Sequence, residues 1–174
     1  MKRKLLIMLV LTLSVLLFTS CDSITDAVDA VTGDNTVTIS GNISKSFEAQ
    51  TVAGTATEDT VAIFAIDMLK DKKELANSLY IFKISDGVPP VGKYNIINLK
   101  TIADLKGDVT DFIGSYMASE NEIYFFESGT VDITKSSNTI VAGTITGKAI
   151  LSNDTNKSIT IKAKFSTVPI NLDR

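Results

Sequence analysis

The sequence predicts an all-β protein, an antiparallel β-sandwich of about eight or nine strands, with an up-and-down β-barrel as the alternative. Two observations predict this fold class. From residue 36 onward, apolar and polar residues alternate in short segments, as they do in half-buried strands. Short polar turns separate these segments at a spacing that sandwiches and barrels share.

In the first half of the domain, residues 36–43 alternate clearly, and the run at 60–66 is apolar on both faces, as in a central strand. Residues 67–77 mix apolar with charged side chains and predict one short helix or a charged loop. A strand at 78–85 ends before the tandem prolines of the 86–92 turn, because proline cannot donate a ladder hydrogen bond.

The middle of the chain predicts less regular structure. A short strand is expected at 93–98, followed by a long polar loop at 99–111. Residues 112–118 and 122–127 flank Ser119-Glu120-Asn121, which predicts a hairpin.

The last third predicts an antiparallel meander, because polar turns join three alternating segments at 131–134, 141–151 and 159–165. Glycine and alanine recur on one face of the middle segment. These small residues leave room for Phe165 or another sheet to pack closely.

The N-terminus predicts export. Three basic residues precede the apolar run Leu5–Phe18, and the small residues Thr19 and Ser20 precede Cys21, the chain's single cysteine. A charged start, a short apolar run and small residues before a cut are typical of an export signal. The run is shorter than the about 20 apolar residues that a transmembrane helix needs.

Residues 17–21, Leu-Phe-Thr-Ser-Cys, resemble the lipobox of bacterial lipoproteins, with Phe18 where that pattern usually has leucine. The resemblance implies that residues 1–20 are a signal peptide and that Cys21 carries the lipid. Residues 21–35 would then be a lipidated acidic tether, and residues 36–174 the β-sandwich domain. The alternative is an ordinary secretory signal followed by an incidental cysteine.

The last third contains three short motifs: Gly-Thr-Val-Asp-Ile-Thr at 129–134, Val-Ala-Gly-Thr-Ile at 141–145, and a strand from Lys164 that ends at Val-Pro. Together they resemble uncharacterised small β-sandwich lipoproteins of Bacteroidota-type bacteria, with Ile145 in place of the usual phenylalanine. The resemblance covers most of the chain after residue 20. It implies a β-sandwich in the cell envelope, and it offers no established activity to carry over.

Composition narrows the function further. The chain has no histidine, which leaves out Ser-His-Asp and Cys-His catalysis and the usual zinc sites. Without residues 1–20 the charge is 14 basic minus 20 acidic residues, or −6. Nucleic acid is therefore not an expected partner, because phosphate binding needs clustered lysine and arginine.

Two groups of acidic residues could serve in catalysis or in metal binding. Glu120 and Glu122 lie near a turn and could form the carboxylate pair of a glycan hydrolase, although a solvated turn is the simpler interpretation. Asp104, Asp108 and Asp111 lie in one loop and could ligate calcium, although their spacing matches no known calcium loop.

Two further patterns concern binding and modification. Tyr80, Tyr94, Tyr116 and Tyr124 could form a binding face, or they are ordinary strand aromatics at the edge of a core. Asp22-Ser23-Ile24 and Asp59-Thr60-Val61 resemble the Asp-Ser/Thr-apolar site of O-glycosylation in such bacteria.

We therefore expect a lipid-anchored cell-envelope protein with a non-catalytic binding or assembly role. No catalytic residue, cofactor or metal is assigned, and Cys21 has the one specific role, lipidation. We expect the outer membrane, on its periplasmic or surface face, as the location. The partners would be the membrane, through the lipid, and other envelope proteins or glycans. The alternatives are a small-ligand carrier with a barrel-like cavity and a carboxylate-dependent glycan hydrolase.

Overall fold

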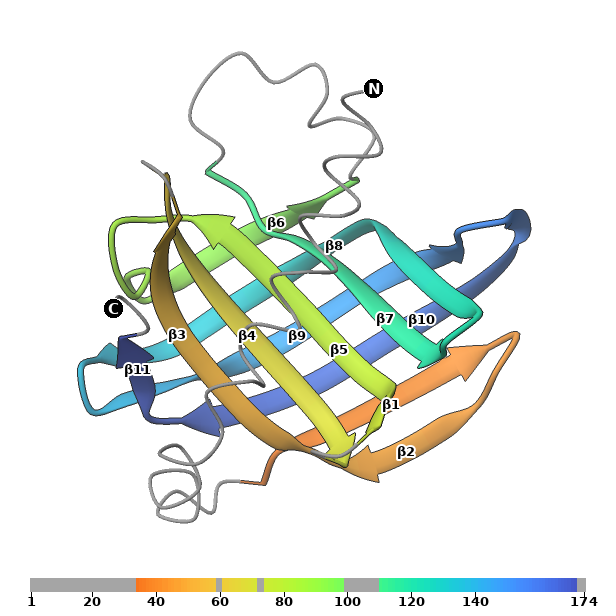
Figure 1. Cartoon of the computed structure of the whole chain (residues 1–174), viewed down its shortest axis with the longest axis horizontal. Coiled ribbons are helices and arrows are strands. Elements are labelled where there is room, and N and C mark those ends of the chain that lie inside the picture. The colour runs from red at the N-terminus through yellow and green to blue at the C-terminus, as the bar shows by residue number, and fades with distance from the viewer. Residues whose placement is uncertain (1–33, 59–60, 72–73, 99–109, 172–174) are drawn as a thin grey trace.

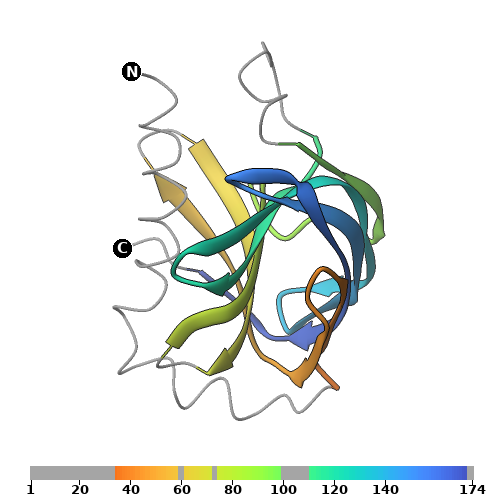
Figure 2. The same cartoon turned by 90° about the vertical axis from the view of Figure 1, so that its right-hand side faces the viewer.

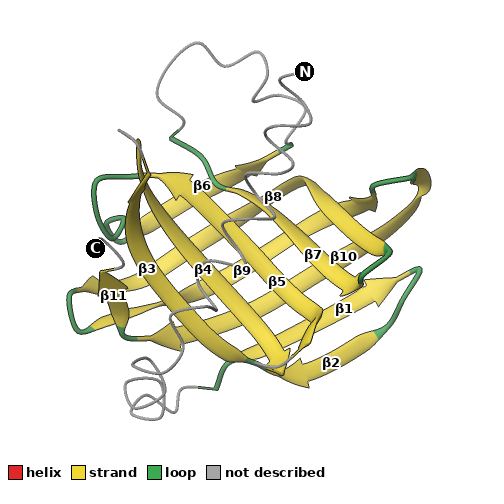
Figure 3. Ribbon diagram, in the orientation of Figure 1, coloured by secondary structure: helices red, strands yellow, loops and turns green. Residues whose placement is uncertain are grey.

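The computed structural model describes residues 34–58, 61–71, 74–98 and 110–171. In this part of the chain there are eleven strands and no helix (Figures 1 and 3), so the all-β prediction is confirmed. Residues 1–33, which include Cys21, lie outside it. The strands are β1 Thr36–Gly41, β2 Lys45–Glu48, β3 Gln50–Glu58, β4 Val61–Asp71, β5 Glu74–Ile84, β6 Gly92–Ile97, β7 Ile113–Ser119, β8 Glu122–Ser137, β9 Ile140–Leu151, β10 Asp154–Thr167 and β11 Pro169–Asn171.

The strands form one strongly curled sheet, and Figure 2 shows it wrapping into a half-barrel. Its order is β11-β3-β4-β5-β7-β8-β9-β10-β1-β2, with β6 beside the middle of β8. The sheet is mixed, because β11 runs parallel to β3 whereas the other named strands pair antiparallel. The predicted sandwich is not confirmed, and the single curled sheet fits the barrel-like alternative.

The two ends of the sheet meet near the start of β3. The Thr167 hydroxyl at the end of β10 donates to the Thr51 carbonyl over 3.0 Å. The Ala49 N–H, between β2 and β3, donates to the Asn35 carbonyl over 2.9 Å. The first bond joins the end of β10 to β3, and the second joins the residue before β1 to the connection that leads into β3, so the two ends of the curled sheet lie close together here.

Glycines allow the strands around β9 to approach each other closely. A Cβ at Gly143 would overlap the backbone carbonyl of Asp132 and lie 3.0 Å from the Phe165 ring. A Cβ at Gly147 would lie 2.6 Å from the Ser128 carbonyl. The predicted close packing of Phe165 against the small residues of this strand is confirmed.

The inner face of the curled sheet holds one continuous hydrophobic core. Cross-strand partners share a face, so alternate residues of each strand enter this core. Its largest fully buried aromatic side chains are Phe64, Phe112, Tyr116, Tyr124, Phe126 and Phe165.

Most of the sequence-based strand predictions are confirmed. Strands occur at or near 36–43, 78–85, 93–98, 112–118 and 141–151, and β10 covers the last predicted segment. β2, β3 and β11 were missed, and the two strands expected at the start and end of β8 are one strand. Two register shifts interrupt its pairing with β9, and bulges of this kind bend a strand. The predicted loop lies mostly outside the described residues.

The prediction of a helix or charged loop at residues 67–77 is wrong. Asp67 to Asp71 complete β4, and Glu74 to Asn77 begin β5. Met68 points into the core, whereas Leu69 points to the outer face, and both are buried. Cross-strand pairing with β3 and β5 therefore outweighs the helix-forming composition of the segment.

Candidate functional site

The connection between β5 and β6, residues 85–91, is hydrogen-bonded to neighbouring strands of the half-barrel. We call it the Pro loop. The Tyr94 hydroxyl donates to the Pro90 carbonyl over 2.8 Å, and the Ser136 hydroxyl donates to the Pro89 carbonyl over 2.7 Å. The prolines also fix their own φ angles. Within this held loop Val91 is 62% exposed, so the loop presents an apolar side chain to solvent.

Lys83 lies next to the Pro loop, near the end of β5. Its register partner on β4 is the core residue Phe64, so its side chain is on the inner face, and the residue is only 8% exposed. Its Nζ lies 5.2 Å from the centre of the Tyr94 ring, which is within cation–π range. The Tyr94 ring in turn packs edge-on against Phe112, with ring centres 5.7 Å apart.

The electrostatics of this group favour an anion. Burial lowers the pKa of Lys83 below its usual value, and the negative charge of Asp111 opposes that shift. The salt bridges of the described residues do not include Lys83. Asp111 offsets the cost of this partial burial only in part, so an anionic group placed beside Lys83 would be bound favourably.

The structure does not gather the acids that the sequence singled out. Asp104 and Asp108 lie outside the described residues, and Asp111 is half-buried. Glu120 and Glu122 are exposed at the turn between β7 and β8. Within the described ranges, no group of three or more acids, cysteines or histidines could hold a metal ion.

The four tyrosines do not form one binding face. Tyr116 and Tyr124 point into the core with ring centres 6.5 Å apart, and burial is the main cause that raises the pKa of Tyr116 to about 12. Tyr80 is buried but does not belong to the core cluster, and its partner Asp67 lies on the outer face. Tyr94 alone belongs to the group around Lys83.

The remaining predicted positions cannot be placed. Cys21 and the possible glycosylation sites at Ser23 and Thr60 lie outside the described residues.

Sequence reasoning missed Lys83, although a signal for it exists. In the strand from Leu79 to Ile84, every second residue enters the core, and Lys83 follows Leu79 and Ile81 in that register. A lysine at an inward position of an apolar strand is unusual. Its proximity to Tyr94, by contrast, depends on tertiary packing.

Among the residues that the structure describes, no helix has the length and apolar character to cross a membrane. The chain matches no protein-family model, no curated protein and no solved structure.

Proposed function

We propose that this protein is a lipid-anchored cell-envelope protein whose half-barrel has a non-catalytic binding role. The Pro loop and Lys83 form its binding site, for a partner that carries an acidic group. The observation that carries this proposal is Lys83, a lysine whose side chain is largely buried and has no salt bridge to any described residue, beside a fixed loop with an exposed apolar residue. Binding residues on loops that a rigid scaffold positions are common in β proteins.

The N-terminus supports the anchor. The export signal and the lipobox-like stretch end at Cys21, and the described β domain begins at residue 34. Residues 22–33 would let the barrel lie up to about 40 Å from the lipid if fully extended. Within that upper limit, the Pro loop would face other envelope proteins or glycans near the membrane.

The packed core favours surface binding over the carrier role. Phe64, Phe126 and Phe165 fill the inner face and are almost completely buried. The exposed turn that carries Glu120 and Glu122 gives little support to a glycan hydrolase, because such enzymes hold a carboxylate pair on either side of a bound sugar.

The anchor is tested by changing Cys21→Ala in the full chain and fractionating cells. We expect the wild-type chain in the membrane fraction and the variant in the soluble fraction. Unchanged membrane association of the variant would refute the anchor.

The binding site is tested by photo-crosslinking in cells. A photoreactive amino acid at position 91 should form one defined adduct, whereas the same group at the exposed position 146 on β9 should not. Lys83→Met should weaken the adduct from position 91, because it removes the charge but keeps the bulk of the side chain. Equal adducts from both positions, or no effect of Lys83→Met, would overturn the proposed site.

A further inference from the structure

A second apolar surface lies on the outside of the sheet. Across β4, β5 and β7, register partners on the outer face include Ala65, Phe82 and Ile113, and the next rows add Tyr80 and Leu69. We call this surface the outer apolar face. Leu69 and Tyr80 are only 1% and 4% exposed, yet neither belongs to the core cluster of the inner face.

The opposite side of the half-barrel differs. On β1, β9 and β10 the outward register partners Thr38, Lys162 and Thr146 are all exposed. Along this row the outward side chains are polar, whereas apolar outward side chains gather on β4, β5 and β7 and continue to Phe125 and Ile150, which indicates a surface built to be covered.

Asp67 lies within the outer apolar face, opposite Tyr80 on β5. It is 2% exposed, and its Oδ1 has no hydrogen-bond partner in the described part of the structure. The described strands contact mainly their sheet neighbours, and none of them forms a second layer over this face. A sheet whose outer residues are this buried requires a covering segment.

The chain that precedes β1 enters at the edge of this face. Asn35 is hydrogen-bonded to Ala49. Gln50, which follows Ala49 in the chain, is the register partner of Leu69 on the outer apolar face. As a helix, residues 22–33 would be about 18 Å long. From β4 to β8 the face spans three strand spacings, about 14 Å, so the segment is long enough to cross it.

The segment also has a suitable pattern. Ile24, Ala27, Val28 and Val31 follow the spacing i, i+3, i+4, i+7, which places them on one side of a helix. The three aspartates at 22, 26 and 29 fall on the other side. An apolar stripe of this kind is complementary to an apolar sheet face.

We propose that residues 22–33 dock across the outer apolar face, with Ile24, Val28 and Val31 against β4, β5 and β7. The docked segment then fixes the position of the half-barrel relative to residue 21. This proposal does not depend on lipidation or on the Pro loop.

The first test is a disulfide in the full chain with Cys21→Ser. Val28→Cys is combined with Ser115→Cys, which lies on the outer face between Tyr80 and Phe125, and mild oxidation is followed on non-reducing gels. The matched control combines Val28→Cys with Thr146→Cys on the polar side. We expect the first pair to close within one molecule at least about tenfold faster than the control, because a disulfide needs Cα atoms within about 7 Å.

Three outcomes would overturn the docking: equal rates for both pairs, no intramolecular disulfide, or disulfides only between two molecules, which would assign the face to a second copy. A second test does not touch the half-barrel. Val28→Asp with Val31→Asp should raise the binding of a dye for exposed apolar surface, whereas Asp26→Asn with Asp29→Asn should not. If both double variants bind equal amounts of dye, the outer face is not covered by this segment.

Discussion

The hydroxyl of Tyr116 donates a hydrogen bond to Oδ1 of Asn77, 3.1 Å away, at the start of β5. The same Oδ1 also accepts a bond from Nζ of Lys45 over 2.9 Å. Asn77 has a φ of 61°, in the left-handed region, which asparagine tolerates better than most residues. One asparagine thus joins a core tyrosine and the β2 strand at an irregular point of β5.

Tyr116→Phe should lower the free energy of unfolding by about 1 kcal/mol, because it removes one hydrogen bond and keeps the ring. Asn77→Ala should cost more than Asn77→Gly, by about 1 kcal/mol, since a Cβ is strained at this φ whereas glycine is not. Urea unfolding measures both differences. An Asn77→Ala variant as stable as Asn77→Gly would contradict the strained backbone.

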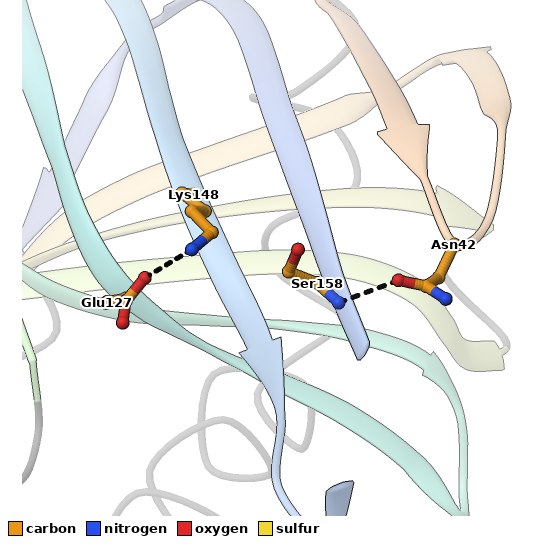
Figure 4. A network of polar contacts seen from close by, with 4 residues as sticks. All are labelled: Asn42, Glu127, Lys148 and Ser158. Atoms are coloured by element: carbon orange, nitrogen blue, oxygen red, sulfur yellow. Dashed lines mark hydrogen bonds and ion pairs between the residues drawn. The ribbon is translucent and has the colours of Figure 1, made fainter. Parts of the chain in front are cut away.

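A second asparagine secures an irregular point of β10, as Figure 4 shows. Oδ1 of Asn42 accepts a bond from the Ser158 N–H over 2.8 Å. The Asn42 N–H also donates to the Ser158 carbonyl over 3.1 Å. The pairing of β10 with β9 shifts register just before Ser158. Asn42→Ala should therefore cost about 1 kcal/mol, because it leaves a backbone N–H at the bulge without its partner.

The control for this substitution is Glu127→Gln, also in Figure 4. Glu127 lies 2.8 Å from Nζ of Lys148, but both side chains are about half exposed. Ion pairs of this kind contribute about 0–1 kcal/mol, so we expect a change of about 0.5 kcal/mol or less. If Glu127→Gln proved more destabilising than Asn42→Ala in thermal unfolding, this ranking would be wrong.

The close approach of β8 and β9 gives a third prediction. Gly143→Ala should destabilise the protein by about 1–3 kcal/mol, because the new methyl group would overlap the Asp132 backbone and press on Phe165. Gly87→Ala is the matched control, since nothing lies within 4 Å of its Cβ position. Equal stabilities of the two variants in urea unfolding would show that the strands can separate without cost.

Sequence patterns predicted the buried positions better than they predicted the sheet. The alternation at β1, β9 and β10 follows from one buried face, and that signal is local. Whether one curled sheet or two stacked sheets bury that face depends on contacts such as Thr51 with Thr167, which lie far apart in sequence. Alternation therefore left sandwich and barrel unresolved.

The helix or charged loop expected at 67–77 and the candidate site show the same point, that local sequence does not report contacts between distant segments. Met68 and Leu69 lie on opposite faces of β4 and are both buried, and strands buried on both faces lose their alternation. Lys83 was visible as an inward lysine, but its neighbours Tyr94 and Phe112 come from other segments. Local sequence does not report which segments meet at one end of a half-barrel.

Asp67 makes the stability depend on pH in an unusual direction. Burial raises the pKa of its carboxyl from 3.8 to about 7, and a hydrogen bond with the Met68 backbone opposes this only in part. Well below pH 3.8 the side chain is protonated in both states, and this group does not make stability depend on pH. Between these two values the unfolded chain releases the proton while the folded chain keeps it, so the folded state becomes less stable as pH rises.

We therefore predict that Asp67→Asn removes a loss of stability that wild type shows between about pH 4 and pH 7. The contribution of one such group approaches about 1.4 kcal/mol per pH unit in the middle of that window and levels off above pH 7. The measurement is the difference in free energy of unfolding between Asp67→Asn and wild type, from urea titrations at several pH values, because the difference cancels the shared contributions of the other acids. A difference for Asp67→Asn that stays constant with pH would mean that Asp67 is ionised in the folded protein, and that the outer apolar face is open to water.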